Sequence, residues 1–535
     1  MDTSDGFNLE NKNLKVNVYT SLVALSVLLV TWIVASQSLK LKSFGKRIDK
    51  IPGPFSVPIL GTLVLIVIPR SEILEVLVRW TKKFKQGCFR LWLLNEPVVF
   101  ISSPDHVQKI LGSKEHVEKT ELYNVLKPLI GNGLITADVP SWKAHRRLLI
   151  NSVNGKMVNI FMGVCNQTLG TFHDILSKEP SIVNFDEEPT QRTNLHPFIN
   201  RLAFDIICET IFGISKETLK NSSTYYLNVS HKNKTVMSNR WFSPWLRWKW
   251  VWAIHPLKQY ENDVKAAVNE LFDFVVTERR RLRQLDHDIN TNEIDPESSA
   301  LKSHKHIGRG ALIDTLLDAA ENEENGITDE YIKSELMTFL VAGHDTSSET
   351  ILWTLFMLGS YPEHQEKVNN ELKEIFGSNR NPDLTLDDLS RLTYLDQCVK
   401  ETLRIYPSVP LLMRKVNTDV EMEPDLIIPA GTDVALCIPA IHQNPLIYKD
   451  PKKFDPERFA PDKIADIHPY AYCPFSLGPR NCIGKRLGEV LTKIVLARLF
   501  LNYSVASIQK PEEVKIVAEV TLGPSKPIFF YVKKR

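Results

Sequence analysis

The segment PFSLGPRNCIGKRLG, residues 474–488, surrounds a single cysteine with glycines and cations. Cys482 stands between Gly478 and Gly484, and Arg480 precedes it by two residues. A cysteine that only fills a hydrophobic core needs neither flexible backbone nor positive charge beside it. Cationic neighbours instead favour the thiolate, which is a strong electron-donating ligand for haem iron. The segment therefore predicts a haem-ligating loop, and a structural cysteine in a glycine-rich loop is the alternative.

The sequence of this loop resembles the haem-binding loop of the cytochrome P450 family. Phe475, Gly478, Arg480, Cys482 and Gly484 all stand at the family's spacing. The two glycines permit the backbone to bend toward the metal, and Arg480 can pair with a haem propionate. The resemblance implies that the chain binds haem b, with Cys482 as the axial ligand of the iron.

A long helix is predicted upstream of the loop, from an N-cap at Thr328 to a stop before Pro362. Its middle reads AGHDTS, residues 342–347. A mid-helix threonine ordinarily bonds to the carbonyl one turn earlier, but beside a glycine it can open the helix and leave room for dioxygen and water. The resemblance implies that Asp345 and Thr346 are the acid and alcohol pair that delivers protons to oxygen.

The motifs ETLR and PERF contribute three further charged residues. Glu401 and Arg404 lie one helical turn apart, which by itself is typical of a solvated helix face where an ion pair contributes little. The resemblance implies that Arg458 joins them in a buried triad behind the haem loop. Because such a triad is costly to desolvate, we expect it to fix geometry and to take no part in catalysis.

Three residues are expected to complete the cofactor pocket. The segment WKAHRR, residues 142–147, resembles the family's helix in which Trp142 and Arg146 contact a propionate. Arg414 stands where the family has another cation of this set. Taken alone, WKAHRR also fits an amphipathic surface turn. The motifs occur in the family's order, so the resemblance extends over nearly the whole chain.

Helical periodicity dominates along the chain and short strand-like runs are few, which predicts a large protein that is mainly α with a minor β part. The chain has 535 residues, 43% of them hydrophobic, and can bury a sizeable core. Its net charge of +2 indicates no nucleic-acid partner. The seven cysteines form no CxxC pair, which argues against a disulfide framework and against a zinc site. We expect one catalytic domain with the cytochrome P450 fold over residues 56–535.

The N-terminal region predicts a membrane anchor. Residues 18–35 form an uncharged, mostly apolar run at the lower length limit of a transmembrane helix. The positively charged linker and proline hinge at 36–55 follow it, and the positive-inside rule then places residues 1–17 in the lumen. We expect a single-pass protein of the endoplasmic reticulum membrane with a cytosolic catalytic domain. A cleaved signal sequence is the alternative.

Three local features refine these expectations. The motifs look most like the family-4 branch, many members of which carry a glutamate before the helix glycine that forms an ester to haem. Here the position is Ala342, which predicts non-covalent haem. Five tryptophans within residues 241–252 favour a segment in the membrane interface over a buried aromatic patch. The polar stretch 281–310 predicts an exposed loop.

We expect a haem-thiolate monooxygenase that inserts one atom of O2 into a hydrophobic substrate such as a fatty acid, a hormone-like lipid or a xenobiotic. The resemblance implies that segments 122–134 and 409–413 line the substrate pocket, and their mostly apolar side chains indicate a hydrophobic substrate. Electrons are expected from NADPH through cytochrome P450 reductase, with cytochrome b5 as a further partner, since no flavin or nicotinamide motif is evident. Four cations are candidate docking residues: Lys143, Arg147, Lys485 and Arg486.

Two alternatives stay open on the sequence alone. One is a haem-thiolate isomerase or dehydratase that rearranges peroxides without dioxygen or a reductase. The pair Asp345 and Thr346 argues against it, because such chemistry needs no proton delivery to oxygen. The other is a haem-binding sensor or carrier without turnover. Consumption of NADPH with a reconstituted reductase and candidate lipids distinguishes both from a monooxygenase.

Overall fold

The computed structural model describes residues 44–535, apart from the positions 58–60, 63–66, 85–86, 95, 151, 154, 185, 190, 215–216, 222–224, 291–310 and 322–326. The predicted lumenal segment 1–17 and anchor 18–35 lie outside the described residues. Among the helices that are described, no single one is both long and apolar enough to cross a bilayer. Helices α6 (Val139–Ile150) and α7 (Gly155–Leu176), bent by 69° against each other, meet these requirements only as a pair.

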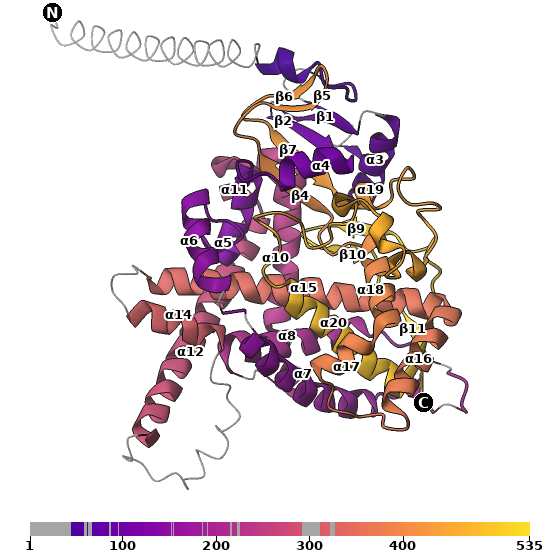
Figure 1. Cartoon of the computed structure of the whole chain (residues 1–535). Helices are drawn as coiled ribbons and strands as arrows, with labels where there is room; N and C mark the ends of the chain where they lie inside the picture. Colours follow the sequence, from indigo (N-terminus) through magenta and orange to yellow (C-terminus); the bar gives the residue numbers. More distant parts are fainter. Residues whose placement is uncertain are drawn as a thin grey trace, which may run out of the picture.

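Helix α15 (Asp329–Ser360) runs through the body of the protein, and many other elements pack against it (Figure 1). Its 32 residues span about 48 Å. The helix begins as predicted, because the side chain of Thr328 accepts a hydrogen bond of 3.2 Å from the N–H of Tyr331. It ends as predicted before Pro362, which cannot continue a helix.

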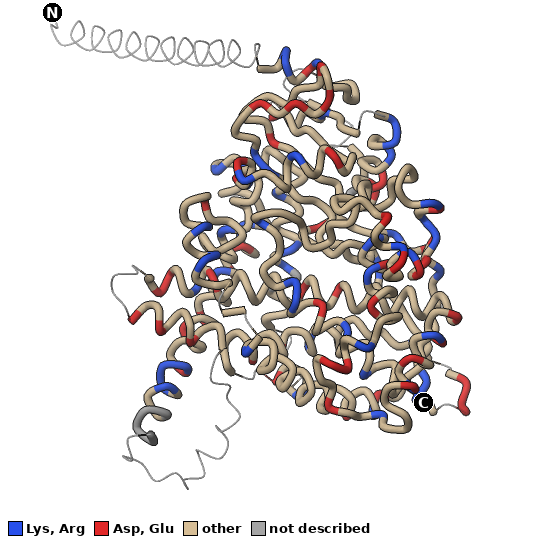
Figure 2. The backbone as a smooth tube through the Cα atoms, in the orientation of Figure 1, with Lys and Arg blue, Asp and Glu red and all other residues tan. Residues whose placement is uncertain are grey.

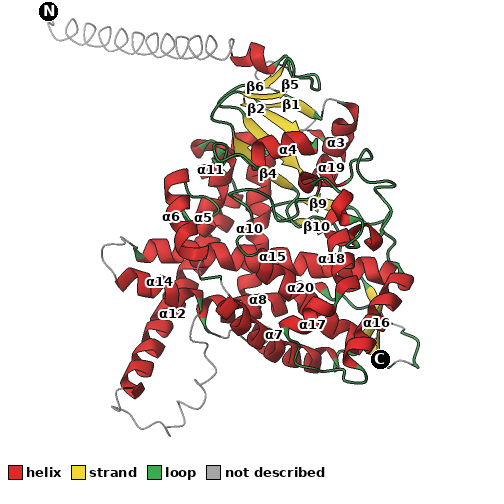
Figure 3. Cartoon of the chain, in the orientation of Figure 1, coloured by secondary structure: helices red, strands yellow, loops and turns green. Residues whose placement is uncertain are grey.

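Helices make up most of the described chain (Figure 3). The remaining α-helices are α3 (Arg70–Lys83), α4 (Pro104–Leu111), α5 (Lys127–Ile130), α8 (His196–Phe212), α9 (Thr218–Asn221), α10 (Tyr225–Phe242), α11 (Lys249–Ile254), α12 (Leu257–Asn290), α14 (Leu312–Glu321), α16 (Pro362–Phe376), α17 (Leu386–Arg391), α18 (Thr393–Ile405), α19 (Ile438–His442) and α20 (Lys485–Asn502). The 3-10 helices are η1 (Glu121–Leu126), η2 (Pro244–Arg247), η4 (Pro456–Phe459), η5 (Ile464–Asp466) and η6 (Pro469–Ala471).

The strands form small sheets, so the prediction of a mainly α protein with a minor β part is confirmed. The largest sheet has the order β1 (Cys88–Leu93), β2 (Glu96–Ile101), β7 (Asp433–Cys437), β4 (Leu411–Lys415). Strands β2 and β7 are parallel, with Val98 opposite Asp433, and the two outer pairings are antiparallel. The smaller sheets use β3 (Ile182–Val183), β11 (Phe530–Lys534) and β8 (Tyr503–Ser507), then β5 (Val420–Glu423) with β6 (Leu426–Ile428), and β9 (Ile516–Ala518) with β10 (Leu522–Pro524).

Two hydrophobic clusters support this arrangement. The larger one surrounds α15, where Trp353 is fully buried and its ring stacks on Tyr406 with the ring centroids 4.1 Å apart. The smaller cluster lies around the four-stranded sheet and includes Val99 and Leu436 from its two central strands. Helix α15 is therefore buried in an apolar interior, so the few of its residues that keep exposed surface must do so for another reason.

The prediction of a loop that starts at Arg281 is wrong for its first ten residues, because α12 continues to Asn290. The polar composition of this part reflects ion pairs on the helix surface. Arg281 contacts Glu278 at 2.6 Å, one helical turn earlier, and Arg283 contacts Glu321 at 3.1 Å. Arginine and glutamate are good helix formers, so a charged segment can be a solvated helix. Elsewhere positive and negative residues are interspersed along the chain (Figure 2).

Candidate active site

Cys482 lies in a tight loop that leads into α20. Its N–H donates a hydrogen bond of 2.9 Å to the carbonyl of Phe475. Gly478 has a φ of +72°, and a Cβ atom there would lie 1.8 Å from the carbonyl oxygen of Leu111. Only glycine fits this position. Gly484 differs from the expectation, since its φ of −86° is open to any residue and it serves as the N-cap of α20.

The surroundings of the Cys482 thiol act on its pKa in opposite directions, with a net increase. The residue is exposed, yet neighbouring protein atoms partly remove its thiol from water and raise the pKa of that thiol. The N–H of Gly484 and the cations of Arg146 and Lys485 act in the opposite direction and lower that pKa. The positive end of α20 adds to their effect. A metal ion bound by the sulfur would stabilise the thiolate.

Arg480 and Arg414 are predicted cofactor-binding residues that form a group of cations together with Lys119. Arg480 and Arg414 are only 8% and 2% exposed. Burial and the charge of Arg414 lower the pKa of Arg480 to about 10. Burial and the charges of both arginines lower the pKa of Lys119 well below its usual value. Sequence reasoning missed Lys119, because it belongs to none of the motifs.

The contacts of this group do not neutralise it. Arg480 donates hydrogen bonds to the carbonyls of Val117 at 3.1 Å and Ala137 at 2.8 Å, while its Nε finds no partner. Arg414 donates to the carbonyl of Met413. In the described part of the chain, no ion pair with a carboxylate is found for Arg480, Arg414 or Lys119, although Asp138 has a weak influence on Arg480.

Buried cations without counter-ions are unfavourable unless a ligand brings negative charge. The two propionates of haem are ligand groups of this kind, and the described residues therefore fit haem.

Trp142 and Arg146 lie on α6 beside this group, but they make different contacts. Trp142 is buried, and the Arg480 guanidinium lies 4.8 Å from the centre of its ring. Arg146 donates a hydrogen bond of 2.9 Å to the carbonyl of Asn481, next to Cys482. The structure thus places Arg146 at the cysteine loop, and its expected contact with a propionate stays a prediction.

The middle of α15 is accessible on one side. Ala342, Gly343 and Thr346 keep exposed surface, whereas His344, Asp345 and the residues from 347 to 358 are buried. The Thr346 hydroxyl donates a hydrogen bond of 2.6 Å to the carbonyl of Ala342. The expected local opening of the helix is therefore absent, and the threonine bonds one turn back, as mid-helix threonines usually do.

Asp345 points away from the hydroxyl of Thr346. Its carboxylate forms an ion pair with Lys234 of α10 and accepts a hydrogen bond of 2.9 Å from Thr521. Burial alone would raise the pKa of Asp345, but Lys234, His344 and the hydrogen bonds hold it below its usual value. In this conformation Asp345 is ionised, and it must gain a proton before it can donate one.

The structure brings the predicted triad together. Arg404 binds both carboxylate oxygens of Glu401, at 2.7 and 2.8 Å, and both side chains are completely buried. Arg458 lies 3.5 Å from the same carboxylate. The remaining donors of Arg404 reach the carbonyls of His442 and Pro451. Nearly every polar group of the triad side chains has a hydrogen-bond or ion-pair partner within the protein. The triad is therefore a structural support.

The two segments expected to line the substrate pocket contact each other. Tyr123 of η1 accepts a hydrogen bond of 3.3 Å from the N–H of Met413 in β4. The side chains of Leu122, Val125 and Leu126 are buried, and Leu411, Leu412 and Met413 keep some exposed surface. These apolar groups provide an environment for a hydrophobic molecule.

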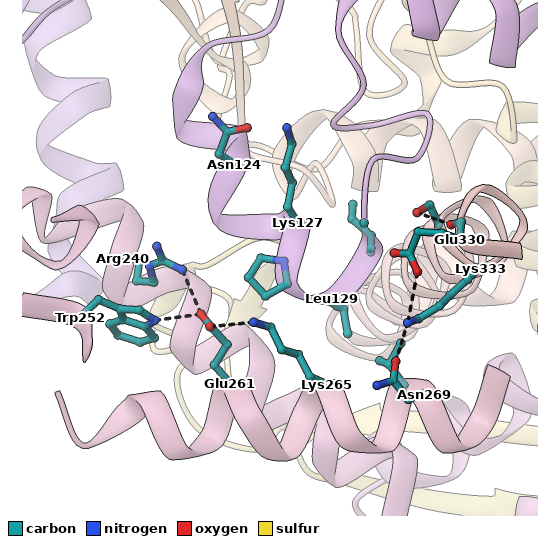
Figure 4. Close-up of a pocket in the computed structure, with 15 residues that line it drawn as sticks. Asn124, Lys127, Leu129, Arg240, Trp252, Glu261, Lys265, Asn269, Glu330 and Lys333 are labelled. Carbon is teal, nitrogen blue, oxygen red and sulfur yellow. Dashed lines mark hydrogen bonds and ion pairs between the residues drawn. The ribbon is translucent and has the colours of Figure 1, made fainter. Parts of the chain in front are cut away.

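The five tryptophans divide into two groups, so the prediction of a wholly interfacial segment is wrong. Trp241 donates a hydrogen bond of 2.9 Å to the carbonyl of Leu122, and Trp245 packs in a small apolar cluster. Trp252 is buried and donates to Glu261 at 2.9 Å in a polar pocket between α5, α12 and α15 (Figure 4). Trp248 and Trp250 are 49% and 68% exposed and stack on each other.

Comparisons with known proteins agree with this geometry. Residues 51–530 match the family described as "Cytochrome P450". The chain is 30% identical to Cytochrome P450 4c3 of Drosophila melanogaster, covering 90% of this chain and 88% of that one. It is 33% identical to Cytochrome P450 4c21 of Blattella germanica, covering 92% and 94%. It is 32% identical to Cytochrome P450 4V2 of Rattus norvegicus, covering 89% and 88%.

The fold has a counterpart among solved structures. The crystal structure of the cytochrome P450DA heme domain superposes with a TM-score of 0.73 at 21% identity, covering 91% of this chain and 98% of that one. At this identity the similarity concerns the fold alone.

Proposed function

The chain belongs to the cytochrome P450 family, in its family-4 branch, and is a P450 monooxygenase; we propose that it oxidises a hydrophobic substrate with electrons from NADPH, delivered by a reductase at the endoplasmic reticulum membrane. The observation that carries the proposal is the loop of Cys482, where an exposed thiol and a nearby group of cations without carboxylate partners fit haem. Bound haem supplies the iron centre at which dioxygen is reduced and one oxygen atom is transferred to the substrate.

The residues of the chain have separate tasks around this cofactor. Cys482 would bind the iron, and Gly478 allows the backbone turn that presents its thiol. Arg480, Arg414 and Lys119 would hold the propionates. On α15, Asp345 and Thr346 would supply protons, because both lie beside the accessible stretch at Ala342. Ala342 has no carboxyl group, so the haem would be held without an ester bond.

A hydrophobic substrate is favoured by the apolar residues of η1 and β4. Their side chains include Leu122, Val125 and Met413, which contribute no charge to the interior. Binding of a nonpolar molecule against such residues is driven by removal of apolar surface from water. The fatty acids, hormone-like lipids and xenobiotics considered above all meet this requirement.

Docking of a reductase is supported by four cations near the cysteine loop. Lys143 and Arg147 lie on α6, Lys485 and Arg486 on α20, and all four are exposed. Arg146, between the first two, bonds to Asn481 and thereby joins α6 to the loop. A positive surface attracts an acidic electron donor, either the reductase or cytochrome b5. Replacing all four with glutamine should weaken electron transfer and leave haem binding intact.

Membrane association is supported by exposed apolar side chains of α11. Trp250 and Ile254 are 68% and 82% exposed, and Lys249 between the tryptophans is exposed as well. Arg247 contacts Glu96 at 2.7 Å and so fixes this segment beside strand β2. Aromatic and cationic side chains together are typical of the membrane interface. With the anchor predicted at residues 18–35, we infer a single-pass protein with a cytosolic catalytic domain.

The decisive experiment is the carbon monoxide difference spectrum of the reduced protein. The wild type should show the strongly red-shifted Soret band of a thiolate-ligated haem, and Cys482→Ser should abolish it. Cys473→Ala is the matched control, because Cys473 is buried in the same region and should leave the band unchanged. A band at the position of imidazole-ligated haem, or no haem at all, would overturn the assignment. Acid extraction should release the haem, and haem retained on the protein would contradict the absence of an ester.

A further inference from the structure

A polar pocket of about 540 Å³ lies between α5, α12 and the start of α15 (Figure 4). Helix α10 and the short helix α11 each contribute one side chain to its wall. Neither the cysteine loop nor the middle of α15 lines it, so it lies apart from the residues that fit haem. Four cations and two carboxylates face this space, which gives the lining a net charge of +2: Lys127, Arg240, Lys265 and Lys333, with Glu261 and Glu330.

One end of the pocket holds more positive charge than its carboxylate can balance. Glu261 is buried and accepts hydrogen bonds from Arg240 at 3.0 Å and from Trp252 at 2.9 Å. Lys258 contacts the same carboxylate, and the Nζ of Lys265 lies 3.4 Å from it. Burial alone would raise the pKa of Glu261, but Lys258 and the other two cations hold it below its usual value. Glu261 is thus ionised, and three cations surround its single negative charge.

The rest of the pocket adds two more lysines. Lys333 of α15 lies 3.7 Å from Glu330 and donates a hydrogen bond to Asn269 of α12. Lys127 of α5 is exposed, and its ammonium group has no hydrogen-bond or ion-pair partner among the described residues. In Figure 4, α5 lies between the two ends of the pocket. Positive groups from α5, α10, α12 and α15 therefore face one space, and a negatively charged ligand would reduce their mutual repulsion.

The charge and the size of the pocket favour a phosphate ester as its ligand. A phosphate group carries up to two negative charges, which matches the net charge of the lining. Lysine ammonium groups bind phosphate as point charges and need no fixed geometry. A volume of about 540 Å³ lies within the range of ligand pockets and is larger than a bare phosphate ion requires. The pocket thus has space for a larger group joined to the phosphate.

Helix α11 connects the pocket with exposed apolar surface. Trp252 lines the pocket, whereas Trp250 and Ile254 of the same helix are 68% and 82% exposed. An α-helix with its side chains is about 10 Å across, so these apolar groups lie about that far from the pocket. A ligand with a phosphate at one end and acyl chains at the other can contact both sides of α11.

We propose that this pocket binds the headgroup of an anionic phospholipid while the acyl chains lie against Trp250 and Ile254, an inference that rests on the membrane contact proposed for α11. Lys127, Lys265 and Arg240 would contact the phosphate. The attraction is electrostatic, so binding should weaken as the salt concentration rises. The protein should accordingly gather anionic lipid around α11 from a mixed bilayer.

Brominated lipids test this enrichment in the full-length, haem-loaded protein. Phosphatidylcholine nanodiscs receive the same small fraction of brominated phosphatidic acid or of brominated phosphatidylcholine. The fluorescence of the exposed pair is the difference between the protein and its variant with Trp248→Phe and Trp250→Phe. Phosphatidic acid should quench this signal about 3- to 10-fold more efficiently, since the pocket concentrates it beside α11.

Two results would overturn the proposal, and they are distinguishable. Equal quenching by the two lipids would refute the phosphate pocket and leave α11 in the membrane. An absence of quenching by either lipid would show that α11 does not contact acyl chains, so the membrane contact itself would be wrong. The assignment of the haem-thiolate centre rests on the carbon monoxide band and is unaffected by both results.

Variants of opposite charge effect separate binding from structural damage. Lys127→Gln combined with Lys265→Gln should abolish most of the excess quenching by phosphatidic acid, because two of the cations are lost. Glu330→Gln should increase the excess about 2- to 5-fold, because it removes a negative charge from the lining. Lys449→Gln combined with Lys452→Gln is the matched control, at two exposed lysines outside the pocket. An unchanged excess in both pocket variants would refute the site. Haem content should stay constant throughout.

Glycerol 3-phosphate distinguishes a lipid from a soluble phosphate compound. It carries the phosphate without acyl chains, so it should reduce the excess quenching only at millimolar concentrations, since it lacks the apolar contacts. Complete competition at micromolar concentrations would identify a soluble phosphate ester as the ligand and would refute the phospholipid.

Discussion

Two groups of buried charges in this protein are built in opposite ways. In the triad, Glu401 balances Arg404 at 2.7 Å with no exposed surface on either residue. In the cation group, Arg414 and Arg480 lie close to Lys119. Burial lowers the pKa of all three side chains, and the charges of neighbouring cations lower the pKa of Lys119 and Arg480 further. The triad is complete within the protein, whereas the cation group requires an anion from outside.

This difference distinguishes buried charged residues that stabilise the fold from buried charged residues that bind a ligand. A buried charge that finds its counter-ion in the chain holds the fold together, and its removal leaves an unpaired partner. A buried cation that contacts only carbonyl groups lowers the stability of the haem-free protein. Binding of an anionic ligand offsets this loss. The two groups should therefore respond to mutation in opposite ways, with and without haem.

The largest effect is expected from Glu401→Gln. It leaves Arg404 completely buried without its negative partner, which should lower the free energy of unfolding by about 3 to 5 kcal/mol. Urea denaturation should show the loss in haem-free and haem-loaded protein alike. Glu457→Gln, at a partly exposed residue nearby that pairs with Lys367 on the surface, should change stability by less than about 0.5 kcal/mol. A loss below about 1 kcal/mol for Glu401→Gln would contradict the role of the triad.

Arg414→Met should act in the other direction. The haem-free protein should keep or gain stability, because a buried, uncompensated charge is removed. Haem affinity should fall about 10- to 100-fold, as expected for the loss of one charge-assisted hydrogen bond. Haem transfer to apomyoglobin measures this affinity, and Lys415→Met is the control on the neighbouring position of β4. Equal losses of stability with and without haem would show that Arg414 is only a support.

Lys119 predicts a dependence of stability on pH. Its pKa in the folded, haem-free protein lies well below 10.5, so above the folded value the unfolded chain binds more protons. Stability should therefore rise with pH between the folded pKa and about 10.5, by at most about 1.4 kcal/mol per pH unit. Haem or Lys119→Met should remove this slope. Urea denaturation at several alkaline pH values measures it, and an identical slope in the variant would exclude Lys119 as its source.

The smallest effect is expected from Arg458→Gln. Arg458 is the outer member of the triad, with its side chain 13% exposed and 3.5 Å from Glu401. Since Arg404 still neutralises Glu401, the variant should lose about 1 kcal/mol of stability. Denaturation in parallel with Glu401→Gln gives the ranking within the triad. A loss as large as that of Glu401→Gln would mean that the two arginines contribute equally.

Much of the fold and of the haem site could be predicted because it is encoded in local motifs. The cap at Thr328, the stop at Pro362 and the spacing around Cys482 each act within a few residues. The triad was predictable from its resemblance to the family. By contrast, Lys119 and Lys234 belong to no motif, and the charged residues that act on them lie far away in the chain. The end of α12 was misjudged because charged residues fit a loop and a solvated helix equally well.

The sequence by itself determined the family, the thiolate ligand and the long helix, because these depend on residue type and short spacing. Only the tertiary structure decided which charges are paired. A buried cation either pairs with a carboxylate of the protein or lacks such a partner and can bind an anionic ligand. Which of these holds depends on the residues that the fold packs against it, because those neighbours set the free energy of a buried charge. That is why Glu401 is a support and Arg414 a candidate binding residue, although each is one charged residue among many.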